Sequence, residues 1–197
     1  LAKVLIDAKD DPSVILGTRT HDLKGGNWRK GKSDLFLVEA CEYQRQFLHL
    51  HPQTILLTNI SGDHFDAFRD LNDYRSAFVE FIEQLPSHGL LITHMQDRGC
   101  AEMAEKAPCV VLDADTFALP ALSIPGEHMQ RNAQLVAAFA HHSGIENVEE
   151  SLRTFSGAWR RSEIKGEFGE GILLIDDYGH HPNEIRATLE GLKKAYP

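Results

Sequence analysis

The chain has 197 residues, of which 42% are hydrophobic and 25% are charged, and its formal net charge is −9 at pH 7. This hydrophobic content is sufficient for a buried core, which excludes a disordered tail. The 29 acidic residues outnumber the 20 basic ones, and this balance opposes contact with nucleic-acid phosphates, so we expect no nucleic-acid partner.

Neither membrane insertion nor secretion is indicated by the sequence. It contains no apolar run as long as a membrane-spanning helix, and its first residues do not form a signal peptide. The three cysteines have no C-x-x-C spacing, which argues against a disulfide framework or a zinc ribbon. We therefore expect a cytoplasmic protein with no membrane partner.

Strand-like and helical patterns alternate along the chain. Helical periodicity is found at 1–8, 66–85, 97–106, 126–143, 147–154 and 183–195. Strand-like runs are found at 13–17, 34–39, 54–59, 89–93, 109–113 and 171–176. These runs are continuously apolar, as in strands covered on both faces. The alternation predicts an α/β fold with a doubly wound, mostly parallel sheet and helices on both of its faces.

Two connecting segments have a composition of their own. Residues 18–33 are polar and rich in glycine, which predicts a loop or an irregular hairpin. Residues 114–125 form a predicted connector that ends at a helix start, because Pro125 and Gly126 precede a long periodic run.

Polar side chains follow two of the predicted strands. Glu39 closes the strand 34–39, Asn59 closes the strand 54–59, and His64 lies in the loop that follows. Ligands of open α/β sheets bind at the carboxyl ends of the strands. If these strands are neighbours, Glu39 and His64 converge on one crevice, where a carboxylate beside phosphate oxygens would require a cation such as Mg²⁺.

Spacing alone also allows a structural interpretation of this cluster. Glu39 could be a solvated strand end, and Asp63 and Asp66 could cap a helix that begins near Phe65.

A second group of polar residues lies at the start of the helix predicted after residue 126. His128 and Asn132 are four residues apart, so they share one helix face and could both reach a nucleotide base or phosphate. They could equally be surface residues of an amphipathic helix.

Two further clusters lie near the end of the chain. Arg160 and Arg161 could each bind a phosphate or carboxylate through two hydrogen bonds, although adjacent arginines point in different directions. The strand 171–176 leads into the sequence "DDYGHHP", which contains Asp177 and His180 and is the densest titratable group in the chain. A hydrolytic metal site there is conceivable, but no known ligand spacing supports it.

Four stretches, taken in order, resemble the Mur ligase family. They are "VEACEYQRQFLHL", "TNISGDHFDAF", "PGEHMQRNA" and "DDYGHHPNEI", which are similar to the family patterns E-A-D-E-S-D-x-x-F-L-H-L, T-N-I-x-x-D-H-x-D, P-G-x-H-N-x-x-N-A and D-D-Y-G-H-H-P. Within the family, the members that join L-alanine to UDP-N-acetylmuramate are the most similar.

The resemblance implies an enzyme of peptidoglycan precursor synthesis, an ATP-dependent amide ligase that works through an acyl phosphate. It implies a fold like that of P-loop NTPases, with a central ATP-binding domain at 1–182 and the start of a linker to a C-terminal domain at 183–197. By motif matching, Glu39 and His64 would each ligate Mg²⁺. Asn59, His128, Asn132, Asp177 and His180 would serve the bound nucleotide: His128 and Asn132 on the adenine side, Asp177 at the ribose, and His180 in the hinge stretch. Arg160 or Arg161 would contact the phosphates.

The sequence departs from the family in several places. The phosphate-binding loop G-T-x-G-K-[ST] does not occur, and residues 1–14 resemble the helix that follows this loop. We therefore expect that the chain was cut just beyond that loop and that it is inactive in isolation. Cys41, Tyr43 and Met129 replace the usual Asp, Ser and Asn, so the resemblance does not fix the exact substrate. Two alternatives stay open: a recycling ligase that adds a tripeptide to UDP-N-acetylmuramate, and a non-catalytic binding module.

Overall fold

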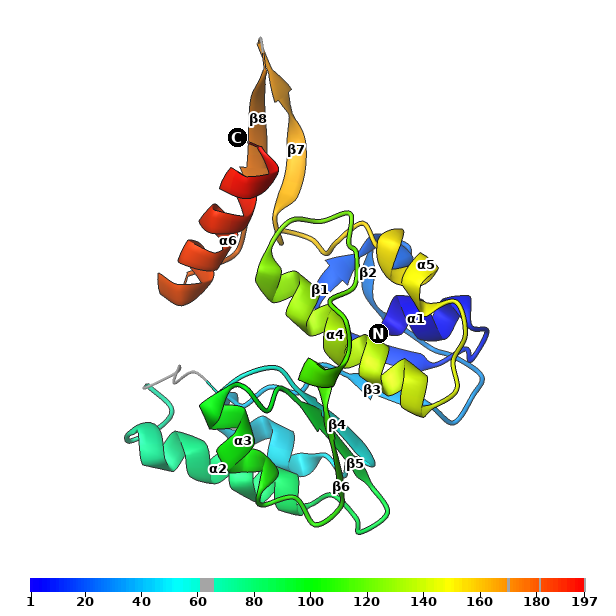
Figure 1. Ribbon diagram of the computed structural model, residues 1–197, viewed down its shortest axis with the longest axis vertical. Helices are drawn as coiled ribbons and strands as arrows, with labels where there is room; N and C mark the ends of the chain where they lie inside the picture. The colour runs from blue at the N-terminus through cyan, green and yellow to red at the C-terminus, as the bar shows by residue number, and fades with distance from the viewer. Residues whose placement is uncertain (61–65, 170, 181, 197) are drawn as a thin grey trace. The chain divides into compact units, whose positions relative to one another are not determined.

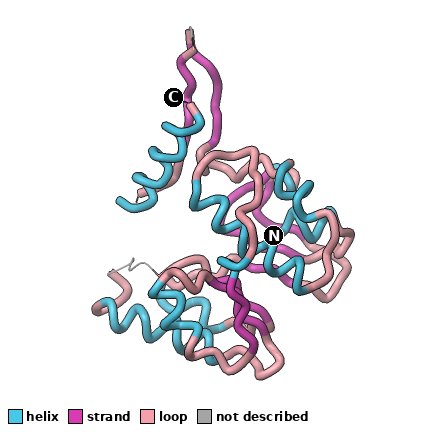
Figure 2. Tube along the Cα trace, in the orientation of Figure 1, coloured by secondary structure: helices cyan, strands magenta, loops and turns pink. Residues whose placement is uncertain are grey.

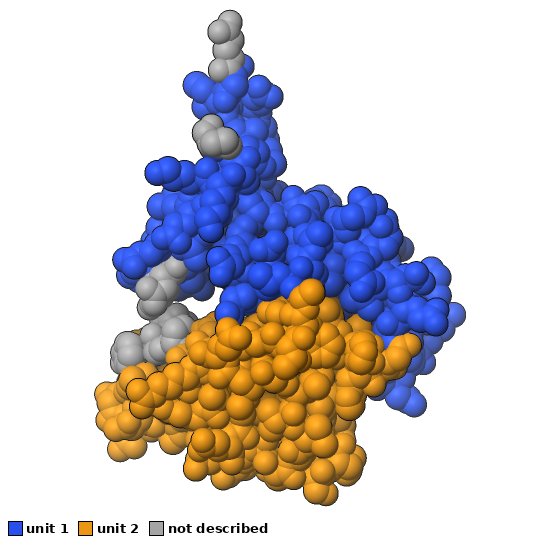
Figure 3. Space-filling view, viewed as in Figure 1, with its two compact units in different colours: residues 1–39, 119–133, 145–197 blue, residues 40–118, 134–144 orange. Residues whose placement is uncertain are grey.

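The computed structural model describes residues 1–60, 66–169, 171–180 and 182–196. The chain forms two compact units (Figure 3). Unit 1 comprises residues 1–39, 119–133 and 145–197, and unit 2 comprises residues 40–118 and 134–144.

The helices and strands follow the predicted order closely (Figures 1 and 2). With η marking a short 3₁₀ helix, they are α1 (Ala2–Asp7), β1 (Ser13–Thr20), η1 (His21–Leu23), β2 (Gly26–Arg29), β3 (Phe36–Val38), η2 (Tyr43–His49), β4 (Thr54–Leu57), α2 (Leu71–Glu83), β5 (Leu90–Thr93), α3 (Arg98–Ala104), β6 (Val110–Asp113), η3 (Ala114–Thr116), α4 (Glu127–His142), α5 (Val148–Arg153), β7 (Glu163–Phe168), β8 (Ile172–Asp176) and α6 (Pro182–Ala195).

Unit 2 is built on the parallel sheet β4–β5–β6, with β5 in the middle. Successive side chains of a strand point to opposite faces of its sheet. Ile55 and Leu91 therefore pack against α2 and α3, whereas Ile92 packs against Leu135 and Ala138 of α4. A parallel sheet with helices on both faces confirms the predicted α/β fold.

Helix α2 begins later than its periodicity predicts. Asp70 is its N-cap, and the Asp70 side chain accepts a hydrogen bond from the backbone N–H of Asp73 at 2.8 Å. The interpretation of Asp66 as the cap is wrong, because residues 66–70 precede the helix. Asp63 lies outside the described residues.

Unit 1 contains the three-stranded sheet β2–β1–β3, in which β1 pairs antiparallel with β2 and parallel with β3. Val14 of β1 is fully buried against Ala2 of α1 and Leu23 of η1. Helix α5 packs on α1, where the Ser151 hydroxyl donates a hydrogen bond to Asp7 at 2.7 Å. The register between β1 and β2 is irregular, so the segment 18–33 is the irregular hairpin that its composition allows.

The last part of unit 1 consists of the antiparallel hairpin β7–β8 and the helix α6. Strand β7 was not predicted, because its sequence "EIKGEF" mixes charged residues with a glycine and has no apolar run. Both strands carry exposed apolar side chains, among them Phe168 at 59% and Ile172 at 66%.

Helix α6 buries two of its smaller residues in the interior of unit 1. Thr188 and Gly191 are buried, whereas Leu189 is 60% exposed. A Cβ atom on residue 191 would lie 2.7 Å from the Cα atom of Gly126, just before α4. Glycine at 191 therefore permits an approach of helix to backbone that no larger residue allows.

The expected boundary between a central domain at 1–182 and a linker at 183–197 stays a prediction. It coincides with the start of α6.

Candidate functional site

The predicted magnesium ligand Glu39 directly follows β3 and is exposed. Its Oε2 atom accepts a hydrogen bond from the backbone N–H of Gly17 in β1 at 2.9 Å. Carboxylate oxygens are ligands that Mg²⁺ prefers, and an exposed carboxylate at the carboxyl end of a parallel strand is open to a ligand. The residue type, position and exposure of Glu39 therefore fit the ion that the resemblance implies.

Glu39 belongs to a row of contacts along one edge of β1. The carbonyl of Ile15 accepts the backbone N–H of Glu39 at 2.9 Å, and the next contact on this edge is the bond from Gly17 to the Glu39 side chain. The carbonyl of Arg19 then accepts the backbone N–H of Trp159 at 2.8 Å. Backbone groups of alternate residues face the same edge of a strand, so these bonds form consecutive rungs.

Trp159, which is bonded to Arg19, is followed directly by the two predicted phosphate ligands, Arg160 and Arg161. We call these residues the arginine segment. Arg160 and Ser162 have positive φ angles of 56° and 49°, which give the backbone a tight local bend. The Tyr178 N–H donates to the Arg160 carbonyl at 2.7 Å, and the Arg160 N–H donates to Glu163 at 2.9 Å. The backbone N–H and carbonyl of Arg160 are therefore both held, the N–H by the Glu163 side chain and the carbonyl by the Tyr178 backbone.

The two arginines differ in how firmly their side chains are held. The guanidinium of Arg160 lies 5.6 Å from the Trp159 ring and 5.4 Å from the Tyr178 ring, and its Nε is 3.3 Å from Asp176. The guanidinium of Arg161 lies 5.9 Å from the Tyr178 ring and forms no ion pair with the described residues. Arg161 is therefore the better placed of the two to receive an anionic ligand.

Asp177 uses its side chain to hold the local backbone. One carboxylate oxygen accepts the Ser162 N–H at 2.7 Å, and the other accepts the Gly179 N–H at 2.8 Å. The prediction that Asp177 contacts a ribose stays a prediction, but the carboxylate also has this structural task, which the sequence did not indicate.

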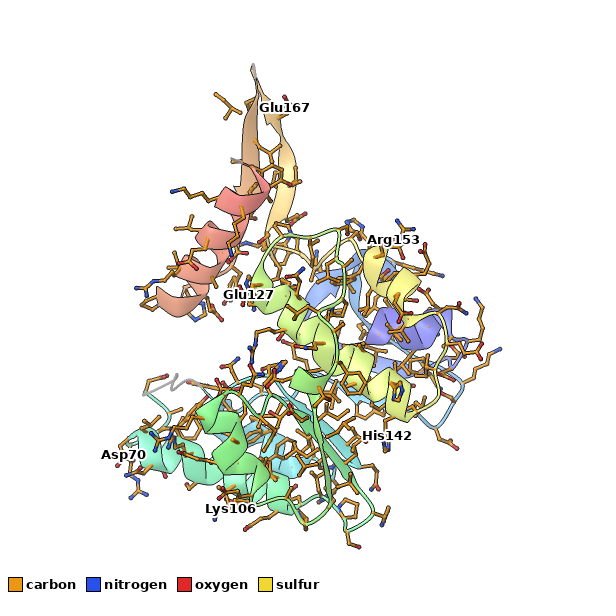
Figure 4. The ribbon with its side chains drawn as sticks, in the orientation of Figure 1. Asp70, Lys106, Glu127, His142, Arg153 and Glu167 are labelled. Carbon is orange, nitrogen blue, oxygen red and sulfur yellow. The ribbon has the colours of Figure 1, made fainter. Side chains whose placement is uncertain are left out.

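His128 and Asn132 both lie in α4, which begins at Glu127 (Figure 4). Asn132 is exposed, whereas His128 is partly buried and its Nδ1 atom has no hydrogen-bond partner among the described residues. Burial lowers the pKa of His128 below its usual value of 6.5; Asp177 acts in the opposite direction and Arg161 adds to the lowering. His128, Asp177 and Arg161 thus share one electrostatic environment in unit 1.

His180 follows the strand β8 and is exposed. Its ring lies edge-on to the Tyr178 ring, with 5.4 Å between the ring centroids. His180 therefore extends the row of arginine and aromatic side chains around Tyr178.

The remaining predicted residues belong to the loop after β4. Asn59 is exposed in unit 2. His64 lies outside the described residues, so its role as a magnesium ligand stays a prediction.

Sequence reasoning missed a buried pair in unit 2. The Nδ1 atom of His94, directly after β5, lies 2.8 Å from the carboxylate of Asp115 in η3, and the two side chains are only 1% and 6% exposed. The Gln96 N–H donates to the other Asp115 oxygen at 2.8 Å, so the loops after β5 and β6 are joined. The only signal was that both residues follow predicted strands.

In the described ranges, no group of three or more His, Cys, Asp and Glu side chains could hold a metal ion by itself. Within the same ranges, no helix is both long and apolar enough to span a bilayer.

Comparison with known proteins gives matches along the chain. The Mur ligase middle domain matches residues 26–119. A UDP-N-acetylmuramate–L-alanine ligase of Clostridium botulinum is 34% identical, with 100% of this chain and 49% of the relative covered. That of Clostridium novyi is 32% identical, with 96% of this chain and 47% of the relative covered.

A solved structure shares the fold. The crystal structure of the UDP-N-acetylmuramate–alanine ligase MurC from Thermotoga maritima matches with a TM-score of 0.80 and 27% identity, covering 99% of this chain and 50% of that chain. The chain spans about half the length of the curated relatives that it matches. Family match, sequence relatives and fold agree, and the chain belongs to the Mur ligase family.

Proposed function

We propose that this chain is the nucleotide-handling part of an ATP-dependent amide ligase that joins L-alanine to UDP-N-acetylmuramate in the cytoplasm. The proposal is supported by 34% identity over the whole chain to a relative that bears this name. It is also supported by the acidic side chain of Glu39 after β3 and by the arginine segment attached to the end of β1.

The observation that carries the proposal is the placement of Glu39. Its carboxylate is exposed at the end of β3, and the Gly17 N–H holds one of its oxygens. The arginine segment is attached to the same edge of β1, through the bond from Trp159 to Arg19. One strand thus supports both an acidic group suited to Mg²⁺ and a basic group suited to phosphate oxygens.

In such a reaction, ATP with Mg²⁺ would supply its γ-phosphoryl group to a substrate carboxylate, leaving ADP, and the amino group of L-alanine would then displace phosphate from the acyl phosphate to form the amide. Reactions of this kind depend mainly on positioning and charge neutralisation. The task of this chain is therefore to hold the nucleotide: Glu39 and His64 on the metal side, Arg161 at the phosphates, and His128 and Asn132 at the base.

Calorimetric titration with ATP and Mg²⁺ tests the proposal. The titration compares this chain with a version extended upstream by its own gene sequence. We expect the extended version to bind, and we expect Glu39→Gln to weaken binding at least tenfold, because the amide keeps an oxygen for the Gly17 N–H but loses the negative charge that attracts the cation.

Glu167→Gln serves as the control variant for Glu39→Gln. Glu167→Gln removes an exposed charge in β7 and should leave binding unchanged. Failure of the extended version to bind ATP would instead support a non-catalytic module.

A further inference from the structure

We propose that the end of β1, residues 17–20, sets the spacing between the Glu39 carboxylate and the arginine segment, and that Thr18 is the positioning residue for the arginine segment. This inference rests on the proposed function, because it concerns how the two parts of that site are held in register.

The first observation is the succession of partners along one edge of β1. Strand β3 pairs with β1 only as far as Ile15. Beyond that point, the edge is occupied first by the Glu39 side chain at Gly17 and then by Trp159 at Arg19. A strand rises about 3.3 Å per residue, so the two attachment points are about 7 Å apart.

The second observation is that threonine hydroxyls reinforce the attachment. The Thr18 hydroxyl donates to the Trp159 carbonyl at 3.1 Å. The hydroxyl of Thr20, a buried residue, lies 3.3 Å from the Gly157 carbonyl. Residues 18 and 20 point to the same face of the strand, so the segment 157–159 follows β1 through side-chain bonds as well as one backbone bond.

The third observation is the stacking of side chains across this contact. The guanidinium of Arg19 lies 5.8 Å from the Trp159 ring, and the Arg160 guanidinium lies 5.6 Å from the same ring. Such contacts between cations and aromatic rings are attractive. Any shift of the 157–159 segment along β1 would therefore move Arg160 with it while Glu39 stays on Gly17.

Thr18 holds the segment 157–159 in place more firmly than Thr20 does. The Thr20 hydroxyl also lies 3.4 Å from Asp22, so its single proton has two possible acceptors. The Thr18 hydroxyl donates to the carbonyl of Trp159, whose N–H is already bonded to Arg19. Thr18 thus fixes the second polar group of the residue that immediately precedes Arg160.

The experiment uses Trp159 as its own reporter. The chain has two tryptophans, so Trp28→Phe leaves Trp159 as the single tryptophan, which is excited selectively at a wavelength that the tyrosines do not absorb. In the Trp28→Phe protein, Thr18→Val removes the hydroxyl while keeping the side-chain shape. Thr18→Ser keeps the hydroxyl. Thr154→Val is the matched control, because it removes a threonine hydroxyl that donates to a backbone carbonyl, that of Glu150, at 2.8 Å.

Two readouts are measured for each variant. Trp159 emission and its quenching by iodide report the segment in the chain itself. Titration of the upstream-extended version with ATP and Mg²⁺ reports the consequence for the site. We expect Thr18→Val to shift the emission, to increase quenching and to weaken binding about threefold to tenfold, as for the loss of one hydrogen bond. Thr18→Ser should restore both readouts.

The inference is overturned if Thr18→Val leaves Trp159 unchanged, if Thr18→Ser fails to restore it, or if Thr154→Val has the same effect. Failure of the proposed function has a different signature. In that case the extended parent protein does not bind ATP, while Thr18→Val still shifts Trp159 and Thr18→Ser still restores it, which keeps the positioning role of Thr18 in the fold.

Discussion

The carboxylate of Asp177 holds the backbone of Ser162, whose N–H lies 2.7 Å from Oδ2. Ser162 has a positive φ angle of 49°, a conformation that costs free energy for a residue other than glycine. The carboxylate therefore stabilises a bend that places the neighbouring arginines.

Asp177→Asn tests this relationship. The amide offers one acceptor oxygen in place of two, so either the Ser162 N–H or the Gly179 N–H loses its partner. We expect the free energy of unfolding, measured with urea, to fall by about 1–2 kcal/mol. Glu167→Gln in β7 is the control and should change it by less than about 0.5 kcal/mol. Unchanged stability of Asp177→Asn would show that the carboxylate does not hold the bend.

Burial of His128 predicts a pH dependence of stability. The pKa of His128 is lowered in the folded protein, so the unfolded chain binds its proton more readily. The contribution to stability is complete above the unfolded pKa of about 6.5 and is lost as pH falls through the lower, folded pKa. We expect His128→Gln to flatten this part of the stability profile. An NMR titration of His128 that gave a pKa at or above 6.5 would contradict the prediction.

Gly191→Ala tests whether helix propensity or packing dominates at this position. At an exposed position in the interior of a helix, this change adds about 0.8–1.0 kcal/mol of stability. Here the new Cβ atom would lie 2.7 Å from the Cα atom of Gly126, so we expect a loss of stability and faster tryptic cleavage at Lys193 and Lys194. Glu190→Ala, at an exposed position of the same helix, is the control. A more stable Gly191→Ala protein would rule out the close contact with Gly126.

We expect Arg160 and Arg161 to differ in their roles: Arg160 should matter mainly for stability, and Arg161 mainly for ligand affinity. Arg160→Ala removes a partly exposed ion pair and contacts with two rings, so we expect the free energy of unfolding to fall by about 1–2 kcal/mol.

Arg161→Ala should change stability by less than about 0.5 kcal/mol. In the upstream-extended protein, it should weaken ATP binding severalfold, because it removes a cation that could meet the phosphates. Calorimetry with ATP and Mg²⁺ measures this effect. The reverse assignment would be established if Arg160→Ala lowered affinity without a loss of stability and Arg161→Ala did not.

Much of the fold could be predicted from hydrophobic patterns, and the exceptions have local causes. The apolar run at 89–93 identified β5, because a strand covered on both faces requires continuous apolar residues. Among the residues that the structure describes, strand β7 pairs with β8 alone, and it is largely exposed, so it needs no such run and gave no signal.

The candidate site was only partly predictable. Motifs made Glu39 a candidate, and this residue directly follows β3, as the strand pattern predicts, while its role as a magnesium ligand stays a prediction. The contact between β1 and the segment 157–159 could not be foreseen, because it joins Thr18 to Trp159 across 141 positions of the chain through hydroxyls that leave no periodic pattern. The structural task of Asp177 was hidden for the same reason.

The β7–β8 ribbon has a practical consequence for work in solution. It carries four exposed apolar side chains on a two-stranded element, and such side chains favour association between molecules: Ile164, Phe168, Ile172 and Leu174. At the concentrations used for NMR or crystallisation, the chain is expected to sediment as larger species, and low concentrations of mild detergent should reverse this. Replacing Phe168 and Ile172 with threonine, which suits strands and is polar, should give a better-behaved sample without disturbing the contacts of Glu39.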